Sequence, residues 1–337
     1  MILVISQPME YTTGEVCRWL RYHKVPFIRL HPEDLQEGGM HYQLDNQPEA
    51  PDHRVEIQPQ GREPWHTEEV QTVWYRRWSQ PRQLMQIWKE TDEPELDKVR
   101  RHLGSEFSTL TQTLVRHLGH VTWLNHPSEN HLNKIDVLEK AKAAGFAVPE
   151  TLLTGSKDVL KDFIEQHGEV ISKPVKEVDF FPYHGQEFSL YTTRLSHAEL
   201  DTLPDRFFPT LFQRLVPKQY ELRTFYLDGE CHSMAIFSQT DNKTALDYRR
   251  YNHSNMNQMV PFSLPAEQEQ AVRRLMEKLG MVSGSLDIIR DTEGGYVFLE
   301  VNPVGQFGMV SWPCNYHLEE KVADYLQRKA TESKIYE

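Results

Sequence analysis

The chain has 337 residues, of which 39% are hydrophobic, and its formal net charge is −12. One hydrophobic core rarely serves such a length, so we expect two or three domains. The negative charge disfavours nucleic acid as a partner, because phosphate backbones normally meet a basic face. No run approaches the roughly 20 apolar residues that span a bilayer, so no membrane partner is expected.

The first residues predict an α/β layer domain. Residues 1–6 form an apolar run without a basic leader or cleavage site, which indicates a first strand and not a signal peptide. A helix over 12–23 and a strand over 26–30 complete a β-α-β opening. No GxGxxG follows the first strand, which disfavours a dinucleotide site there. Residues 40–58 predict a polar β-hairpin.

A strand over 71–78 carries Arg76 and Arg77 at its C-terminal end. Ligands of open α/β sheets bind near such ends, so the two arginines either contact substrate or are plain surface charges. A helix over 92–118 and a strand over 121–124 follow. His126-Pro127 then predicts a domain boundary.

The rest of the chain alternates helical and strand patterns. Helices are predicted over 133–145, 156–167 and 265–279, and strands over 148–153, 169–175, 191–195, 210–216, 221–228, 231–238, 283–290 and 295–301. The last two strands are expected to form a hairpin. Cys17, Cys231 and Cys314 lie far apart without a CxxC pair, which favours a reducing cytoplasm over a disulfide framework.

The final hairpin carries three polar side chains among apolar neighbours. Glu300 and Asn302 share one face of their strand, and Asp287 of the preceding strand can lie across from them. Acids on an otherwise buried sheet face need a partner, and two carboxylates with an amide oxygen suit Mg²⁺. The alternative is a pair of strand acids that point to solvent.

Two lysines indicate phosphate binding. Lys134 opens a helix, and Lys173 lies inside the apolar strand VISKPV. A lysine in a buried strand is costly unless an anion meets it, and a phosphate is such an anion. Alternatively, Lys173 extends to solvent from an edge strand, and Lys134 is an ordinary surface residue.

The segment TLFQRLVPKQYELR predicts a nucleotide-base site. Pro217 interrupts the strand ladder, so unpaired backbone groups from Arg214 to Val216 can face an adenine edge. Glu221 can accept the ribose hydroxyls. Arg223, on the same strand face, can steady phosphoryl or acyl-phosphate oxygens.

The loop DYRRYN carries Asp247, Arg249 and Arg250. Loops often hold binding residues, so these arginines either grip a substrate carboxylate or are surface charges.

In this order and spacing, the motifs resemble the ATP-grasp superfamily over residues 125–325. They are Asn133-Lys134 with AxxxGxxVPxT, Lys173, QxxVPxxxELR, SLD and LExNPxGQF. The resemblance implies an α/β (α+β) chain with an ATP-grasp fold behind a Rossmann-like N-terminal domain. The implied divisions are 1–125, a central subdomain 126–205, and a C-terminal subdomain 206–330 that carries the Mg²⁺ site.

The resemblance also implies roles. The residues implied to contact ATP are Lys134, Lys173, Gln213, Arg214, Leu215, Val216, Glu221 and Asn302. Asp287, Glu300 and Asn302 are implied to hold Mg²⁺, and Arg223 with Lys173 to act on the transferred phosphate. The loop after Lys173 departs from the glycine-rich flap of many members, because Gly185 is its single glycine.

Within that superfamily, MILVIS, PFIRLH, VWYRRW and YTTRL are similar to the ribosomal-peptide maturases of the microviridin and grasp-with-spasm types. This similarity implies an ADP-forming ligase and a homodimer that recognises the leader segment of a precursor peptide. Its Asp or Glu side chains would be activated as acyl phosphates and joined to Ser, Thr or Lys side chains.

Two alternatives stay open. One is a ligase that adds amino acids to a protein or peptide terminus, as the ribosomal S6 modification ligases do. The other is a non-catalytic nucleotide-binding partner protein, which the presence of both lysines and all three oxygen ligands disfavours.

Overall fold

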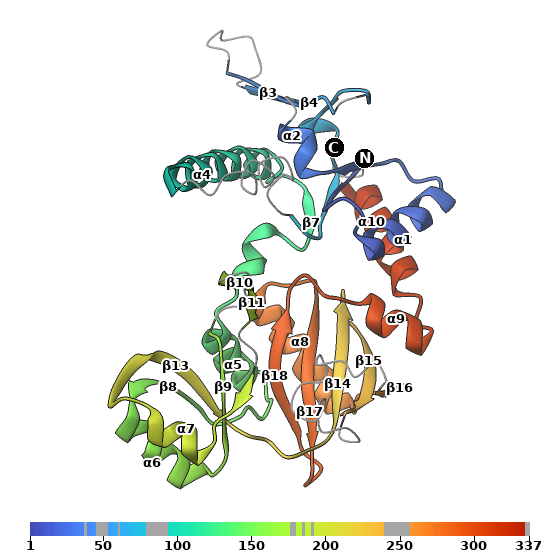
Figure 1. Cartoon of the computed structure of the whole chain (residues 1–337). Helices are drawn as coiled ribbons and strands as arrows, with labels where there is room; N and C mark the ends of the chain where they lie inside the picture. Colours follow the sequence, from blue (N-terminus) through green and yellow to red (C-terminus); the bar gives the residue numbers. More distant parts are fainter. Residues whose placement is uncertain are drawn as a thin grey trace. The chain divides into compact units, whose positions relative to one another are not determined.

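The computed structural model describes residues 1–36, 39–44, 53–59, 61–78, 94–175, 180–183, 186–189, 192–238 and 257–333. The chain divides into two compact units (Figure 1). The first joins Met1–Ser128 to His317–Glu337, and the second is Glu129–Tyr316. Helices pack on sheets in both, which confirms the predicted α/β class.

The first unit is built on a parallel sheet in the order β2-β1-β6-β7. Its strands are β1 (Ile2–Ile5), β2 (Phe27–Leu30), β6 (Thr72–Tyr75) and β7 (Thr122–Leu124). The predicted β-α-β opening is confirmed, with α1 at Tyr11–Tyr22 between the first two strands. All four residues of β1 are buried, as expected for a parallel sheet covered on both faces.

The other elements of this unit flank the sheet. They are α2 (Pro32–Gln36), β3 (Met40–Leu44), β4 (His53–Ile57), β5 (Trp65–His66), η1 (Thr67–Glu69) and α4 (Pro94–His117). The predicted hairpin over 40–58 is confirmed by the antiparallel pairing of β3 with β4. Helix α4 confirms the predicted helix over 92–118, and its Phe107 and Leu114 enter the core.

The last helix, α10 (Leu318–Ser333), belongs to the first unit and packs beside α1 (Figure 1). The expected third division extended to residue 330, so the structure corrects its end to Tyr316. The reason is burial. Val322 and Leu326 of α10 are buried, as are Val16 and Leu20 of α1, on helices far apart in the sequence.

The second unit contains a sheet in the order β12-β9-β13-β8. Its strands are β8 (Thr151–Ser156), β9 (Val170–Lys173), β12 (Thr193–Arg194) and β13 (Arg206–Arg214). Helices α6 (Lys157–His167) and α7 (His197–Thr202) contribute Leu160 and Leu200 to a cluster with Phe212 on one face. Because strand side chains alternate, Leu211, Gln213 and the paired Lys173 lie on the opposite face.

The same unit holds an antiparallel sheet in the order β16-β15-β14-β17-β18. Its strands are β14 (Lys218–Leu227), β15 (Glu230–Phe237), β16 (Gln258–Phe262), β17 (Ser283–Asp291) and β18 (Tyr296–Asn302). Helices α5 (Lys134–Ala143) and α8 (Ala266–Leu279) supply Val137 and Leu275 to a cluster that includes Leu286 and Phe298. The predicted final hairpin is confirmed.

Short elements complete this unit: η2 (Pro127–His131), which spans its boundary, the hairpin of β10 (Phe180–Tyr183) and β11 (Gln186–Ser189), and α9 (Gly308–Cys314). Strand β8 begins later than predicted, because Pro149 has no N–H for a ladder. Among the described residues, no helix combines the length and apolar character needed to cross a membrane.

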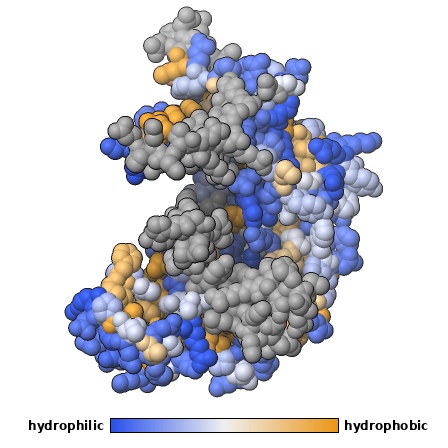
Figure 2. Space-filling view, viewed as in Figure 1, coloured by the Kyte–Doolittle hydropathy of each residue, from blue (hydrophilic) through white to orange (hydrophobic). Residues whose placement is uncertain are grey.

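Gly155 is required by a bulge in β13. The register steps from Arg206↔Ser156 to Thr210↔Thr154, and the extra residues leave Phe208 87% exposed. Figure 2 shows apolar surface on this part of the unit. A Cβ added at Gly155 would lie 2.4 Å from the Phe207 carbonyl oxygen.

We therefore expect Gly155→Ala to lower the free energy of unfolding by about 1–3 kcal/mol, because backbone must shift. The control is Gly14→Ala inside α1, where an added Cβ meets nothing within 4 Å. That variant should gain about 0.5–1 kcal/mol. Denaturant unfolding of both variants checks the prediction, and equal effects would contradict it.

Candidate active site

A buried ion pair lies at the centre of the five-stranded sheet. Arg223 of β14 is directly opposite Asp287 of β17. Its Nη1 donates to both carboxylate oxygens of Asp287 at 2.8 Å, and the two side chains are only 5% and 12% exposed. Sequence analysis placed both residues in the site but did not foresee this pairing.

The predicted oxygen ligands share the face of this ion pair. Glu300 lies directly across from Asp287, as expected, whereas Asn302 lies across from Ser285. Side chains opposite each other in an antiparallel pair project to the same face. Helices α5 and α8 cover the other face, so these polar groups are gathered on the face that those helices leave open.

A tight turn fixes the end of β18. The Gly305 N–H donates to the Asn302 carbonyl oxygen at 3.1 Å, and Gly305 has φ of 56°. A Cβ at Gly305 would lie 3.2 Å from the Phe225 ring, which also packs 4.8 Å from the Phe307 ring. This packing orients the strand end that carries Asn302.

The donor set at this place is two carboxylates and one amide. Among the residues that the structure describes, no group of three or more His, Cys, Asp or Glu side chains is arranged to hold a metal. The predicted Mg²⁺ ligands differ from such a group, because the third of them is the amide oxygen of Asn302. The assignment of Asp287, Glu300 and Asn302 to Mg²⁺ stays a prediction.

The two predicted phosphate lysines come from segments that meet. Asn133 caps α5 by accepting from Ile135 N at 2.9 Å, so Lys134 is the first helical residue. Its Nζ donates to the carbonyl oxygen of Pro174, the residue after Lys173, at 3.1 Å. Lys173 is the last residue of β9 and is partly buried. Strand β9 is less buried than expected, because the described helices cover one face of this sheet.

The hinge, which is the segment 214–217 between β13 and β14, forms more backbone hydrogen bonds than predicted. The N–H groups of Arg214 and Leu215 donate to the carbonyls of Glu150 and Glu169 at 2.9 and 2.7 Å. The prediction that the backbone of these two residues is unpaired is therefore wrong for their N–H groups. The acceptors are the residues directly before β8 and β9.

Apolar side chains gather beside the hinge. Val216 packs with Ile289 and Val297, and Leu299 lies against this cluster. Sequence analysis named Val216 only for its backbone and missed Ile289 and Leu299. The sequence feature that could have identified them is the run of apolar residues interleaved with Asp287 and Glu300 on the final hairpin.

Gln213 is 1% exposed on the face that Lys173 shares. Its Nε2 donates to Thr151 Oγ1 at 2.9 Å. Its Oε1 has no hydrogen-bond partner among the described residues. A buried acceptor in this state is unfavourable unless a ligand supplies a donor.

Glu221, the predicted ribose acceptor, lies in a small network. Lys218 Nζ and Ser238 Oγ both donate to its Oε1 at 2.7 Å. The Lys218 side chain is 7% exposed, and sequence analysis missed it. Its position at the start of β14, three residues before Glu221, is the signal that could have found it.

In the first unit, Arg76 is an interior residue and not a surface charge. It is 1% exposed, and its Nε lies 3.8 Å from Glu10 Oε2. Burial lowers the pKa of Arg76 to about 10, although Glu10 opposes this shift. Burial also raises the pKa of Glu10, but Arg76 and the hydrogen bonds from Thr13 outweigh it and hold that pKa below its ordinary value.

The remaining predicted substrate residues are Arg77 and the loop group. Arg77 is partly buried after β6, and its substrate role stays a prediction. Asp247, Arg249 and Arg250 lie outside the described residues.

No protein-family model and no curated protein match this chain. Solved structures match it along nearly its full length. The macrocyclase MdnC from Microcystis aeruginosa, bound with precursor peptide MdnA, is 22% identical with a TM-score of 0.78, covering 96% of this chain and 98% of its own. A RiPP-associated ATP-grasp ligase from Chryseobacterium gregarium, with ADP and leader and core peptides, is 22% identical with a TM-score of 0.80, covering 98% and 96%.

A third similar structure is the ATP-grasp ligase PsnB with minimal precursor, Mg and ADP. It is 20% identical with a TM-score of 0.73, and the match covers 98% of this chain and 97% of that chain. At such identities the likeness concerns the fold. The fold of this chain is the ATP-grasp fold with an N-terminal α/β domain, as expected.

Proposed function

We propose that this protein is an ADP-forming, ATP-dependent ligase that activates Asp or Glu side chains of a ribosomally made precursor peptide. It joins them to Ser, Thr or Lys side chains of the same peptide as esters or amides. The observation that carries the proposal is the shared sheet face of Arg223, Asp287, Glu300 and Asn302. This face combines a fixed cation with oxygen ligands, as phosphoryl transfer needs.

The second unit has groups that fit ATP. The Gln213 Oε1 is a buried acceptor suited to the amino group of adenine, and Val216, Ile289 and Leu299 offer an apolar surface to the base. Lys134 and Lys173 would meet the phosphates, since an ammonium group is a good point-charge binder of phosphate. Glu221 would accept a ribose hydroxyl.

The oxygen set fits Mg²⁺, which prefers carboxylate and carbonyl ligands and leaves positions for phosphates and water. Asp287, Glu300 and the Asn302 amide oxygen would hold it. When bound, it would offset the negative charge of the phosphates that repels an incoming carboxylate. The proposed cofactors are therefore ATP and Mg²⁺, as in the ADP and Mg complex of PsnB.

The proposed reaction has two displacement steps. A carboxylate oxygen of the peptide attacks the γ-phosphorus, the bond to ADP breaks, and an acyl phosphate forms. A hydroxyl or amine of the peptide then attacks the acyl carbon, loses its proton, and inorganic phosphate leaves. Arg223, oriented by Asp287, would stabilise the negative oxygens in both steps. Tethering both reacting groups in one peptide raises their effective concentration.

The peptide partner is supported by structures similar to this chain over nearly their whole length. MdnC is bound with a precursor peptide, and the Chryseobacterium gregarium ligase is in complex with a leader and core peptide. Recognition of a leader segment belongs to the same proposal, as does a cytoplasmic location. Cys17, Cys231 and Cys314 form no disulfide, which agrees with a reducing compartment.

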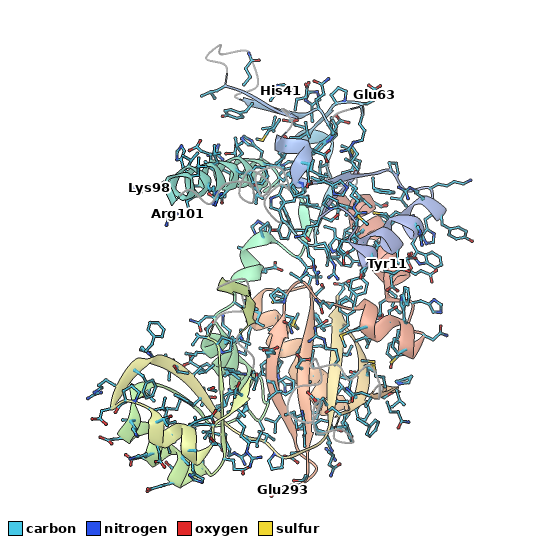
Figure 3. All side chains as sticks on the ribbon, viewed as in Figure 1. Tyr11, His41, Glu63, Lys98, Arg101 and Glu293 are labelled. Carbon is cyan, nitrogen blue, oxygen red and sulfur yellow. The ribbon has the colours of Figure 1, made fainter. Side chains whose placement is uncertain are left out.

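We include a homodimer in the proposal. Helix α4 exposes Val99, Leu103 and Leu110, which are 49%, 37% and 47% exposed. Their spacing places them on one stripe of the helix, which a second copy can cover. Figure 3 shows charged residues of the first turns, Lys98 and Arg101, on the same helix.

Incubation of the enzyme with ATP, Mg²⁺ and its precursor peptide tests the activity. Each ester or amide removes one water molecule, so the peptide should lose the mass of one water per bond while ADP appears. A mass gain with free amino acids would favour a ligase that extends a terminus. No ADP release with any peptide would favour a non-catalytic binding protein.

A further inference from the structure

Ser285 carries a buried hydroxyl that the site described above does not use. It is 0% exposed, and its Oγ has no hydrogen-bond partner among the described residues. A buried hydroxyl in this state lowers stability, since it gives up water without a replacement. Its presence at this place points to a hydrogen bond that forms only when the site is loaded.

The strand register identifies the neighbour of this hydroxyl. Ser285 lies directly between Phe225 of β14 and Asn302 of β18. The Cβ atoms of opposite residues in an antiparallel pair are about 4.5–5.5 Å apart, a span that a hydroxyl and an amide can bridge. Gly305 closes over Ser285, because a Cβ there would lie 3.5 Å from its Oγ.

The amide of Asn302 has two unlike ends. Only its oxygen can bind a cation, while its NH₂ group can only donate hydrogen bonds. A metal at Asp287, Glu300 and Asn302 therefore requires one of two amide orientations. A hydroxyl beside the amide can accept from the NH₂ group and select that orientation.

We propose that Ser285 is a positioning residue: its Oγ accepts a hydrogen bond from Asn302 Nδ2 and so turns Asn302 Oδ1 toward Mg²⁺. This inference rests on the proposed function, because it takes Asn302 as a ligand. Groups that orient metal ligands typically contribute 10–100-fold to metal affinity. Because the Ser285 hydroxyl is a single neutral group, we place its effect near the lower end of that range.

The test uses Mn²⁺ as a spectroscopic probe of the Mg²⁺ site, titrated into the full-length protein with ADP and followed by electron paramagnetic resonance. Ser285→Ala should weaken Mn²⁺ binding about tenfold. The same change in an Asn302→Asp background should have no effect, because both oxygens of a carboxylate can bind the metal. Ser285→Thr, which keeps a hydroxyl, should bind more tightly than Ser285→Ala.

Thermal unfolding without metal or nucleotide separates positioning from ordinary structural support. Removing an unsatisfied hydroxyl should leave the melting temperature of Ser285→Ala unchanged or raise it, whereas loss of a structural hydrogen bond would lower it. Unaltered Mn²⁺ affinity in Ser285→Ala, or equal weakening in the Asn302→Asp background, would overturn the inference. If Asn302→Ala itself binds Mn²⁺ normally, the metal assignment of the proposed function fails instead.

Discussion

Asn302→Ala should remove turnover, with kcat lowered at least about 100-fold. The change deletes the neutral oxygen ligand of the proposed Mg²⁺ site and leaves the carboxylates of Asp287 and Glu300 to hold the metal. Asn302 ends β18 and is only partly buried, so the fold should survive the loss of its amide. Steady-state ADP release at several Mg²⁺ concentrations measures the effect, and higher Mg²⁺ should restore part of the rate.

Glu293→Ala is the matched control. Glu293 is an exposed residue at the turn that joins β17 to β18, at the opposite end of the same hairpin (Figure 3). Its replacement should leave kcat and the Mg²⁺ dependence unchanged. If Asn302→Ala matched this control, Asn302 would not be a metal ligand.

Arg223→Met should destabilise the second unit by about 3–5 kcal/mol, because it leaves the Asp287 carboxylate buried without its cation. Both side chains are almost inaccessible to water, and both Asp287 oxygens accept from Arg223 Nη1, so solvent cannot replace the lost contact. Denaturant unfolding followed in the second unit measures the loss. Turnover should also be lost, because Arg223 is proposed to act on the transferred phosphate.

Two companion variants separate these effects. Arg194→Met removes a contact with Glu169 in which both side chains are more than half exposed, and it should cost less than about 1 kcal/mol. The double variant Arg223→Met with Asp287→Met replaces the ion pair by apolar groups and should regain most of the stability without regaining turnover. If Arg223→Met were as stable as Arg194→Met, the ion pair would not stabilise the unit.

Local patterns were enough to predict the final hairpin. The apolar runs and the turn at Glu293-Gly294 indicate that residues 283–290 pair with 295–301. The pairing of Asp287 with Glu300 also needs a shift in register next to Ile288, which the local pattern does not show. The helix start at Lys134 could likewise be predicted from the sequence, since Asn133 is a favourable N-cap residue.

Pairings between distant segments were not predictable in the same way. The Arg223–Asp287 ion pair joins residues 64 positions apart, and it depends on the register between β14 and β17. That register is set by the packing of the whole sheet and leaves no mark in either segment alone. The packing of α10 against α1 also depends on a partner surface that cannot be identified from the sequence of α10 alone.

The central claim is that ATP transfers phosphate to a carboxylate of the peptide. The most direct measurement supplies the precursor peptide with heavy oxygen in its Asp and Glu side-chain carboxylates, together with enzyme, ATP and Mg²⁺. The account predicts that each new bond moves one heavy oxygen atom into the inorganic phosphate, because the acyl phosphate breaks at its carbon. Bond formation with phosphate free of heavy oxygen, or with the label in AMP, would contradict it.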